Sequence, residues 1–284
     1  MNARSTVVFA CAVATIIVAQ LPGAFAVGQG RGGGRGGASI PFDNVTGFEK
    51  IFDGTTLTNW DGDPTFWRAE AGTIVGESTT EKPVTENTFL IYRGSEPDNF
   101  ELKLEFRMNS TNSGVQYRSR QLTGAVGKWV LCGYQADIDF ANAYTGMLYE
   151  ERGRPGFLAP RGTVQYAGPN DVKQGQCSSG QPVAPRGQGG QTPPAAAPPP
   201  LRGQIGQVAD AEALRSIIKV NDWNQLHIIA RGTTLIHVLN GHVTAVFVDD
   251  DQANRAMKGL LGVQIHTGPP MKIEFRNIYL KNLR

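Results

Sequence analysis

Hydrophobic and polar residues alternate along much of this chain, as they do in β-strands that bury one face. The clearest case is Asn99–Met108, where Phe, Leu and Met alternate with Glu, Lys and Arg. Successive side chains of a strand point to opposite sides, so this alternation predicts a half-buried antiparallel strand. The same reasoning predicts strands at Phe48–Phe52, Gly72–Gly76, Thr88–Tyr92, Gly114–Arg120, Gly133–Phe140, Gly146–Glu150, Asn224–Ala230, Thr234–Leu239, Val243–Val248, Gly259–His266 and Met271–Lys281.

Turn signals separate these strands, and helical signals are rare. Asn240-Gly241 lies between two apolar runs and is typical of a tight β-hairpin loop. Only Ala209–Lys219 and Asp251–Lys258 have a helical pattern. Many short strands with so little helix predict an all-β fold, with two antiparallel sheets packed face to face as a jelly-roll sandwich. A chain of 284 residues with 40% hydrophobic content is large enough for one such domain.

Three segments lie outside the strand pattern. Arg4, the apolar Val7–Leu21 and the small residues before Val27 predict a signal peptide over 1–26, and hence export to the periplasm or the medium. A retained membrane anchor is the alternative. Residues 27–41 are rich in Gly and Arg, and residues 168–206 in Gly, Pro and Gln, so both are predicted to be disordered. The second segment would interrupt a single β-sandwich domain that spans 42–284.

Charge and cysteine content narrow the partners. The formal charge of +2 does not indicate a nucleic-acid partner. No membrane partner is expected after cleavage of the signal peptide, and the oligomeric state stays open. Cys132 and Cys177 would remain in the mature chain, either as a disulfide or as two free thiols. No metal or other cofactor is predicted. Asp249-Asp250-Asp251 could contribute to a calcium site, but a solvated acidic turn is the favoured interpretation.

Three predicted strands carry polar rows with related chemistry. In Gly133–Phe140 the apolar residues occupy one face, and Gln135, Asp137 and Asp139 occupy the other. The remaining rows hold Gln116 with Arg118, and Gln264 with His266. Sugar hydroxyls both donate and accept hydrogen bonds, so amides, carboxylates, a guanidinium and an imidazole together suit a carbohydrate cleft. A solvated outer face is the alternative. Aromatic residues that could stack on sugar rings are Trp60, Trp67, Trp129 and Tyr149, although each tryptophan also fits the core or the rim.

Several motifs occur in an order that resembles a known family. They are FDGTTLTNW from Phe52, NFELKLEFR from Asn99, NSGVQYRSR from Asn112, GYQADID from Gly133, YEERGRPG from Tyr149 and GLLGVQIHTGPPMKIEFRNIYLK from Gly259. Between about Phe42 and Arg284 the chain resembles the 3-keto-disaccharide hydrolase family. The resemblance implies a concanavalin A-like jelly roll, and an enzyme that cleaves glycosides whose sugar is already oxidised at C3.

This chemistry gives the polar residues roles. A C3 ketone acidifies the C2 proton, so a base can remove that proton, the C1 substituent can leave with help from an acid, and water can add. Direct displacement by two carboxylates is the alternative. The expected acid and base are Asp137 and His266, and Arg118 would polarise the ketone or enolate oxygen. The residues expected to orient hydroxyls or to share the face are Gln116, Gln135, Asp139, Tyr149 and Gln264.

Other assignments stay open from the sequence. Glu150 and Glu151 are consecutive catalytic candidates, so a strand would send only one of them into the cleft. His266 could be a structural residue at a strand end, and Arg118 could neutralise a neighbouring aspartate. A non-catalytic, lectin-like carbohydrate-binding module is the alternative function for the whole chain.

Overall fold

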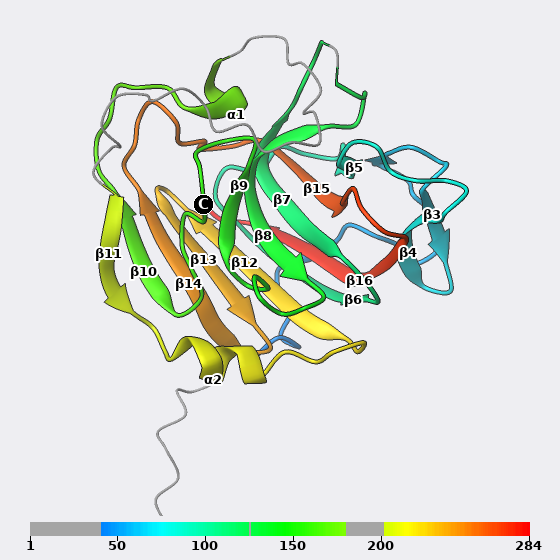
Figure 1. Cartoon of the computed structure of the whole chain (residues 1–284). Coiled ribbons are helices and arrows are strands. Elements are labelled where there is room, and N and C mark those ends of the chain that lie inside the picture. The colour runs from blue at the N-terminus through cyan, green and yellow to red at the C-terminus, as the bar shows by residue number, and fades with distance from the viewer. Residues whose placement is uncertain (1–40, 125, 180–201) are drawn as a thin grey trace, which may run out of the picture. The chain divides into compact units, whose positions relative to one another are not determined.

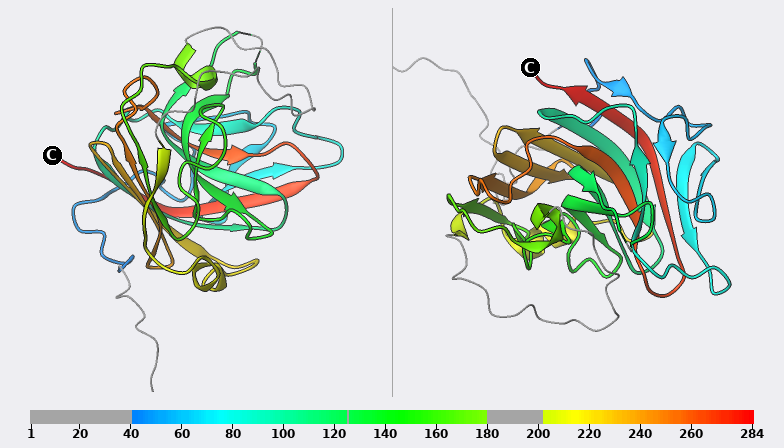
Figure 2. Two further views of the ribbon diagram at one scale, coloured as in Figure 1. Left: turned by 60° about the vertical axis from the view of Figure 1, so that its left-hand side comes forward. Right: turned by 90° about the horizontal axis from the view of Figure 1, so that it is seen from above.

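Two β-sheets lie face to face in the computed structural model, which describes residues 41–124, 126–179 and 202–284 (Figures 1 and 2). The larger sheet has ten strands, with β1 (Glu49–Lys50) beside β16 and the others in the order β11 (Arg202–Gln207), β10 (Thr163–Ala167), β14 (His242–Asp249), β13 (Thr234–Leu239), β12 (Asn224–Arg231), β6 (Phe100–Met108), β16 (Met271–Asn282), β4 (Thr73–Ser78) and β3 (Trp67–Glu70). The smaller sheet has six strands, in the order β2 (Trp60–Asp61), β5 (Thr88–Tyr92), β15 (Leu260–Ile265), β7 (Asn112–Gln121), β8 (Leu131–Asp139) and β9 (Leu148–Glu151).

The predicted all-β, two-sheet jelly-roll sandwich is confirmed. Every strand predicted from the alternation is present, with ends that differ by at most a few residues. The described strands pair antiparallel except for β10 and β14, which run parallel. The prediction missed β2, β3, β10 and β11, which are short or carry few apolar residues, as in the RGQIGQ of β11.

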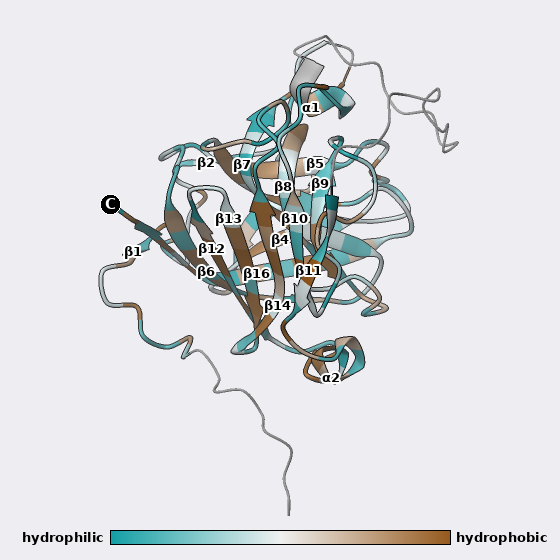
Figure 3. Cartoon of the chain, turned by 90° about the vertical axis from the view of Figure 1, so that its left-hand side faces the viewer, coloured by the Kyte–Doolittle hydropathy of each residue, from teal (hydrophilic) through white to brown (hydrophobic). Residues whose placement is uncertain are grey.

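The core confirms the alternation on the two best predicted strands. Most apolar residues of β6 and β8, among them Leu102, Leu104, Tyr134 and Ile138, belong to one buried cluster between the sheets. Figure 3 shows the hydrophobic colour running along β13, β14 and β16, while many connecting segments are hydrophilic. Burial of these faces is the main term that holds the sheets together, at about 25 cal/mol per Å² of apolar surface. The polar row of β8 therefore faces away from the core.

The two helical predictions had different outcomes. The segment Ala209–Lys219 contains helix α2 (Ala211–Ser216), whose N-cap Asp210 accepts hydrogen bonds from the backbone of Glu212 and Ala213. The helix predicted at Asp251–Lys258 is wrong, because this segment consists of turns and bends. Its Asn254 side chain donates to the Asp251 carboxylate, and such local bonds compete with helix formation.

Both ends of the segment predicted to be disordered are ordered. Residues 168–206 include helix α1 (Gly175–Ser179) near one end and β11 at the other, so the predicted boundaries are corrected there. Residues 180–201 lie outside the described residues. The predicted signal peptide over 1–26 and nearly all of the leader over 27–41 also lie outside them. Within the described ranges, no helix is long and apolar enough to cross a membrane. In Figure 1, α1 and α2 lie at opposite ends of the sheets.

A disulfide joins the smaller sheet to α1. Cys132 in β8 is bonded to Cys177, and their Cα atoms lie 5.3 Å apart. The structure thus resolves a pairing that the sequence leaves open. The preceding residue, Gln176, accepts a hydrogen bond of 2.9 Å from Arg152 Nη1, just beyond β9. The disulfide therefore anchors α1 beside the end of β9.

One buried arginine forms ion pairs with three carboxylates beside β9 and β14. Arg154, whose side chain is 2% exposed, lies 2.8 Å from Glu150, 2.7 Å from Asp249 and 3.5 Å from Asp251. All three acids are buried. The solvated acidic turn predicted at Asp249–Asp251 is therefore wrong, because the first and last of its aspartates turn inward to this guanidinium. Glu150, Asp249, Asp251 and Arg154 are called the Arg154 cluster below.

Candidate functional site

A cleft of about 380 Å³ opens on the face of the smaller sheet that is turned away from the core. Strand register builds it, because Gln135 of β8 lies opposite both Gln116 of β7 and Tyr149 of β9. Asp137 lies opposite Gly114, where a Cβ atom would come within 2.3 Å of the Gln135 side chain. Glycine at this position therefore leaves room for the Gln135 amide. The lining residues are Asn87, Asn112, Gln135, Asp137, Asp139, Tyr144, Tyr149, Glu151, Phe157 and His266.

Asp137 is a buried carboxyl group in the cleft. It is 5% exposed, and its Oδ1 accepts hydrogen bonds from Asn112 Nδ2 at 3.1 Å and Gln135 Nε2 at 3.2 Å. Burial raises the pKa of Asp137 to about 7, and the negative charges of Asp139 and Glu151 add to this effect, whereas the two hydrogen bonds oppose it. At neutral pH this carboxyl group is therefore present in both protonation states, as a general acid or base requires.

A chain of buried side chains fixes the Gln135 amide. Ser119 Oγ donates to Gln116 Oε1 at 2.6 Å, and Gln116 Nε2 donates to Gln135 Oε1 at 2.8 Å. Gln135 Nε2 in turn donates a hydrogen bond to Asp137 Oδ1. Gln116 itself is fully buried and does not line the cleft, so the prediction that it orients sugar hydroxyls directly is corrected. Its contacts make it a positioning residue for Gln135.

His266 lies at the end of β15 with its ring orientation fixed by one hydrogen bond. The Nδ1 atom is 2.5 Å from the carbonyl oxygen of Thr267, and since a carbonyl only accepts, Nδ1 carries the proton. In the neutral ring the lone pair is then on Nε2. The backbone N–H of Thr267 donates to Asn87 Oδ1 at 2.9 Å, which ties this turn to another lining residue.

The structure decides between the two consecutive glutamates. Glu151 lines the cleft, where Asn87 Nδ2 lies 3.4 Å and Arg152 Nε 3.9 Å from its Oε1. Glu150 points to the opposite face of β9 and is bound by Arg154 through both the backbone N–H, at 2.7 Å, and the guanidinium. The catalytic assignment of Glu150 is therefore corrected, because strand alternation places it in the Arg154 cluster.

Arg118 does not reach the cleft. The register of β7 shifts between Tyr117 and Arg120, and Arg118 has a φ of 46°, so the backbone departs from simple alternation there. Its guanidinium donates to the carbonyl oxygens of Asp98, Gly232 and Ala256 at 2.6–3.3 Å. The predicted polarisation of a substrate oxygen by Arg118 is therefore wrong, and this residue binds backbone instead.

Gln264 is also absent from the lining of the cleft. It is completely buried, and both polar atoms of its amide lack a hydrogen-bond partner among the described residues. The alternation correctly places Gln264 on the face opposite to the core residues Val263 and Ile265, but it does not reveal that the side chain is buried there. A direct contact between Gln264 and a sugar is therefore not supported by its position.

Three aromatic residues line the cleft, and two of them, Tyr144 and Phe157, were not predicted from the sequence. Tyr144 and Phe157 stack with ring centroids 5.0 Å apart, and Phe157 lies 5.7 Å from Tyr149. Tyr144 and Phe157 lie outside the strands, so no alternation marked them. The predicted tryptophans are elsewhere: Trp67 is in the core, and Trp60 and Trp129 donate to Ile51 O and Asp61 Oδ1. Asn112 was missed too, although the polar row of β7 extends back to it.

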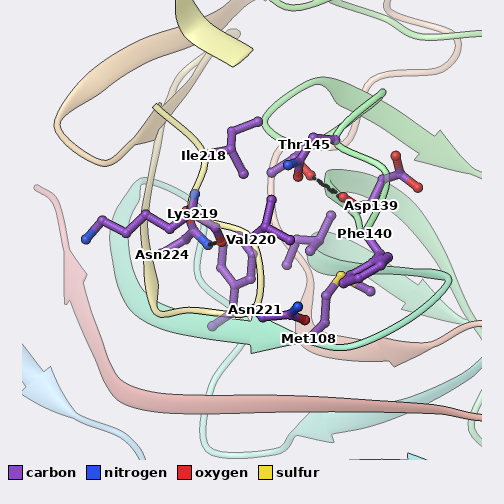
Figure 4. Close-up of a pocket in the computed structure, with 12 residues that line it drawn as sticks. Met108, Asp139, Phe140, Thr145, Ile218, Lys219, Val220, Asn221 and Asn224 are labelled. Carbon is purple, nitrogen blue, oxygen red and sulfur yellow. Dashed lines mark hydrogen bonds between the residues drawn. The ribbon is translucent and has the colours of Figure 1, made fainter. Parts of the chain in front are cut away.

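Two further observations bound the site. Figure 4 shows a separate small cavity between Asp139 and the segment around Val220, with Thr145 hydrogen-bonded to Asp139. Its volume of about 10 Å³ is close to the minimum for one water molecule, so it holds no sugar. Among the residues that the structure describes, no group of three or more His, Cys, Asp or Glu side chains is placed to hold a metal ion.

Comparisons with known proteins concern nearly the whole described chain. A family model described as the 3-keto-alpha-glucoside-1,2-lyase-like domain matches residues 47–281. A comparison with curated proteins gave no match.

Solved structures that resemble the chain include a protein from Parabacteroides distasonis named as a candidate glycosyl hydrolase. It has 18% identity, covers 83% of this chain and 99% of its own, and has a TM-score of 0.46. The carbohydrate-binding module CBM66 from Bacillus subtilis has 13% identity, 85% and 100% coverage and a TM-score of 0.42. A B. subtilis protein with a galectin-like fold has 9% identity, 83% and 98% coverage and a TM-score of 0.47.

Proposed function

This chain belongs to the family described as the 3-keto-alpha-glucoside-1,2-lyase-like domain, and from this premise we propose that it is an exported enzyme that cleaves 3-keto-glycosides, including 3-keto-disaccharides. Membership of this family supports a carbohydrate-related function. The observation that carries the finer proposal is Asp137, a buried carboxyl group with a pKa of about 7 that shares a sugar-sized cleft with His266.

The proposed reaction is a 1,2-elimination followed by hydration. Neutral His266 accepts the C2 proton through Nε2, because Nδ1–H is held by Thr267 O. The electron pair of the C2–H bond moves toward the C3 carbonyl and forms an enolate. The enolate then restores the C3 carbonyl, its C2=C3 electron pair forms a C1=C2 double bond, and the C1–O bond breaks as protonated Asp137 gives its proton to the departing oxygen.

Hydration returns both groups to their starting states. The Asp137 carboxylate takes a proton from water as the water oxygen adds to C1. Protonated His266 gives a proton back to C2, and the free 3-keto sugar forms. The sum is addition of one water molecule across the glycosidic bond, without any oxidant or reductant. Because no bond is cleaved by direct attack at C1, the two groups need not form a glycosyl-enzyme intermediate.

Other lining residues supply binding and charge stabilisation. Each side-chain amide has two N–H groups, so Asn112 retains a second donor beside the one that it gives to Asp137. Such a donor can stabilise the enolate oxygen, the role that Arg118 does not fill. In this proposal Glu151, Asp139 and Tyr149, which line the cleft, orient sugar hydroxyls. The proposal requires no metal or other cofactor.

The direct test compares a 3-keto-glucoside with its unoxidised parent in D₂O. We expect release of the leaving group from the keto compound alone, together with deuterium at C2 of the product. Equal release from both compounds would instead indicate direct displacement at C1. Binding of unoxidised oligosaccharides without release from any substrate would indicate a carbohydrate-binding module.

The pH dependence of kcat/KM reports the role of Asp137. Because the acid form donates the proton, we expect kcat/KM to fall as the pH rises through about 7, the pKa of this carboxyl group. The hydrogen bond from Asn112 lowers that pKa, so Asn112→Ala should move the alkaline limb to higher pH. An unmoved limb in this variant, or a rate that rises through pH 7, would contradict the assignment of Asp137 as the acid.

A further inference from the structure

We propose that Tyr144, Tyr149 and Phe157, called the aromatic wall, form the subsite for the leaving group. This subsite favours glycosides whose leaving group has a flat apolar face, such as an aryl group or a second sugar ring, over small alkyl alcohols. The inference rests on the proposed function, since it names the part of the substrate that lies beside the reacting sugar in the same cleft.

Ring exposure is the first observation behind this inference. Tyr144 is 45% exposed although it is a large aromatic side chain, and it stacks on Phe157, which in turn contacts Tyr149. A contiguous aromatic surface inside a polar cleft is costly to leave in water, and stacking of a ligand ring on an aromatic side chain contributes about 0.5–1.5 kcal/mol beyond the buried area. The wall therefore offers affinity to a flat ligand group but little to a methyl group.

The loop that carries Tyr144 is held in place before any ligand arrives. The buried Arg161 donates to the carbonyl oxygens of Thr145 at 3.0 Å, Asn142 at 3.0 Å and Ala143 at 3.1 Å. From the other side, Asp139 Oδ2 accepts the backbone N–H of Ala143 at 2.8 Å. A ring presented on a fixed loop binds without the entropic cost of ordering that loop.

Strand order places the wall on the leaving-group side of the reaction. Across the smaller sheet the sequence is β15, β7, β8 and β9, so Asp137 in β8 lies between His266, which follows β15, and Tyr149 in β9. Neighbouring strands are about 4.8 Å apart, so the backbones of β15 and β8 are separated by about 10 Å. A sugar held between His266 and Asp137 would give its leaving oxygen to Asp137 and project the attached group over β9.

The size of the cleft agrees with a two-part substrate. Its volume of about 380 Å³ falls within the range of pockets that enclose ligands of more than one ring. Asn87, which accepts from Thr267 next to His266, and Asn112, which donates to Asp137, are the polar residues beside the part that would hold the oxidised sugar. The aromatic wall provides the remaining, apolar surface.

The test measures kcat/KM for phenyl and methyl 3-keto-glucosides of the same anomeric configuration, with the wild-type protein and Tyr144→Ala. Comparing each variant with the wild type on the same substrate removes the difference in leaving-group reactivity. In Tyr144→Ala we expect kcat/KM for the phenyl substrate to fall by a factor about ten times larger than kcat/KM for the methyl substrate. This difference corresponds to about 1.4 kcal/mol of lost ring contact. Phe157→Leu, which keeps apolar volume but removes a ring, should change the ratio in the same direction.

Tyr166→Ala is the matched control, because Tyr166 lies on β10 and does not line the cleft. It should leave the ratio between the two substrates unchanged. If Tyr144→Ala and Phe157→Leu lower both substrates by one common factor, the subsite is refuted while the proposed reaction stands. If the wild type cleaves neither keto substrate, the proposed function fails and the subsite fails with it.

Discussion

Replacing Asp137 by Asn is expected to lower kcat/KM for a 3-keto-glycoside by about 10²–10⁴-fold, the usual contribution of a positioned acid or base. The fold should be retained, because Asn keeps an oxygen that can accept the hydrogen bonds from Asn112 and Gln135. The variant has no proton to give to the leaving oxygen. Steady-state rates on the keto substrate measure the loss, and the alkaline limb near pH 7 should disappear with it.

The same substitution should stabilise the protein at alkaline pH. The pKa of Asp137 rises from 3.8, its ordinary value in an unfolded chain, to about 7 in the fold, so the native state holds this proton more tightly than the unfolded chain does. The stability that this group contributes is therefore complete below about pH 4 and is lost as the pH rises through 7. A shift of this size corresponds to at most about 4 kcal/mol. The Asn side chain cannot ionise, so the Asp137→Asn variant does not lose stability in this way as the pH rises.

Thermal unfolding at pH 8 and pH 4 measures this effect. We expect a higher Tm for Asp137→Asn than for the wild type at pH 8, and nearly equal values at pH 4. Asp43→Asn serves as the control, since Asp43 is exposed and does not line the cleft, and it should change neither rate nor Tm. Undiminished turnover by Asp137→Asn would remove this residue from the mechanism.

Replacing Arg154 by Met is expected to destabilise the protein by about 3–5 kcal/mol, the cost of breaking a buried ion pair. The guanidinium is the cation for three buried carboxylates, Glu150, Asp249 and Asp251. Burial alone would lower the pKa of Arg154, but the charges of Glu150 and Asp249 raise it above its usual range. Without the guanidinium, the three acids repel one another in a site that excludes water. A loss of this size is a large part of the 5–15 kcal/mol that typically stabilises a domain.

Urea unfolding measures the loss, with Arg68→Met as the control. Arg68 pairs with Glu70 and Glu77, but its side chain is 43% exposed, and such surface pairs contribute about 0–1 kcal/mol. The double variant Arg154→Met, Asp249→Asn should regain part of the stability, because it removes one of the uncompensated charges. A loss below 1 kcal/mol in Arg154→Met would contradict a structural role for the cluster. If that variant gives no soluble protein, Arg154→Lys, which keeps the charge but not the planar fork, gives the measurable case.

Sequence predicted the fold well because strand alternation is a local property. Side chains of β6 and β8 occupy the predicted faces, and this alone placed Gln135, Asp137 and Asp139 together. The prediction of side-chain direction failed where an irregular backbone interrupts the two-residue alternation of a strand. At Arg118 the shifted register of β7 redirects the side chain to backbone carbonyls, and no residue pattern marks that shift.

Other parts of the site depend on distant segments. Glu150 and Glu151 could be separated only by knowing how β9 pairs with β8, where Tyr149 lies opposite Gln135. The aromatic wall combines β9 with two loop residues that are adjacent only after folding. The burial of Gln264 is likewise a property of its neighbours and not of its own strand.

The charge of the cleft limits which sugars it can accept from the environment. Asp137, Asp139 and Glu151 line it, and none of its described lining residues is Lys or Arg. A phosphorylated sugar or a uronic acid would bring further negative charge beside these carboxylates, where like charges in a low-dielectric site repel strongly. We therefore expect the natural substrates to be uncharged glycosides, taken before any kinase has acted on them.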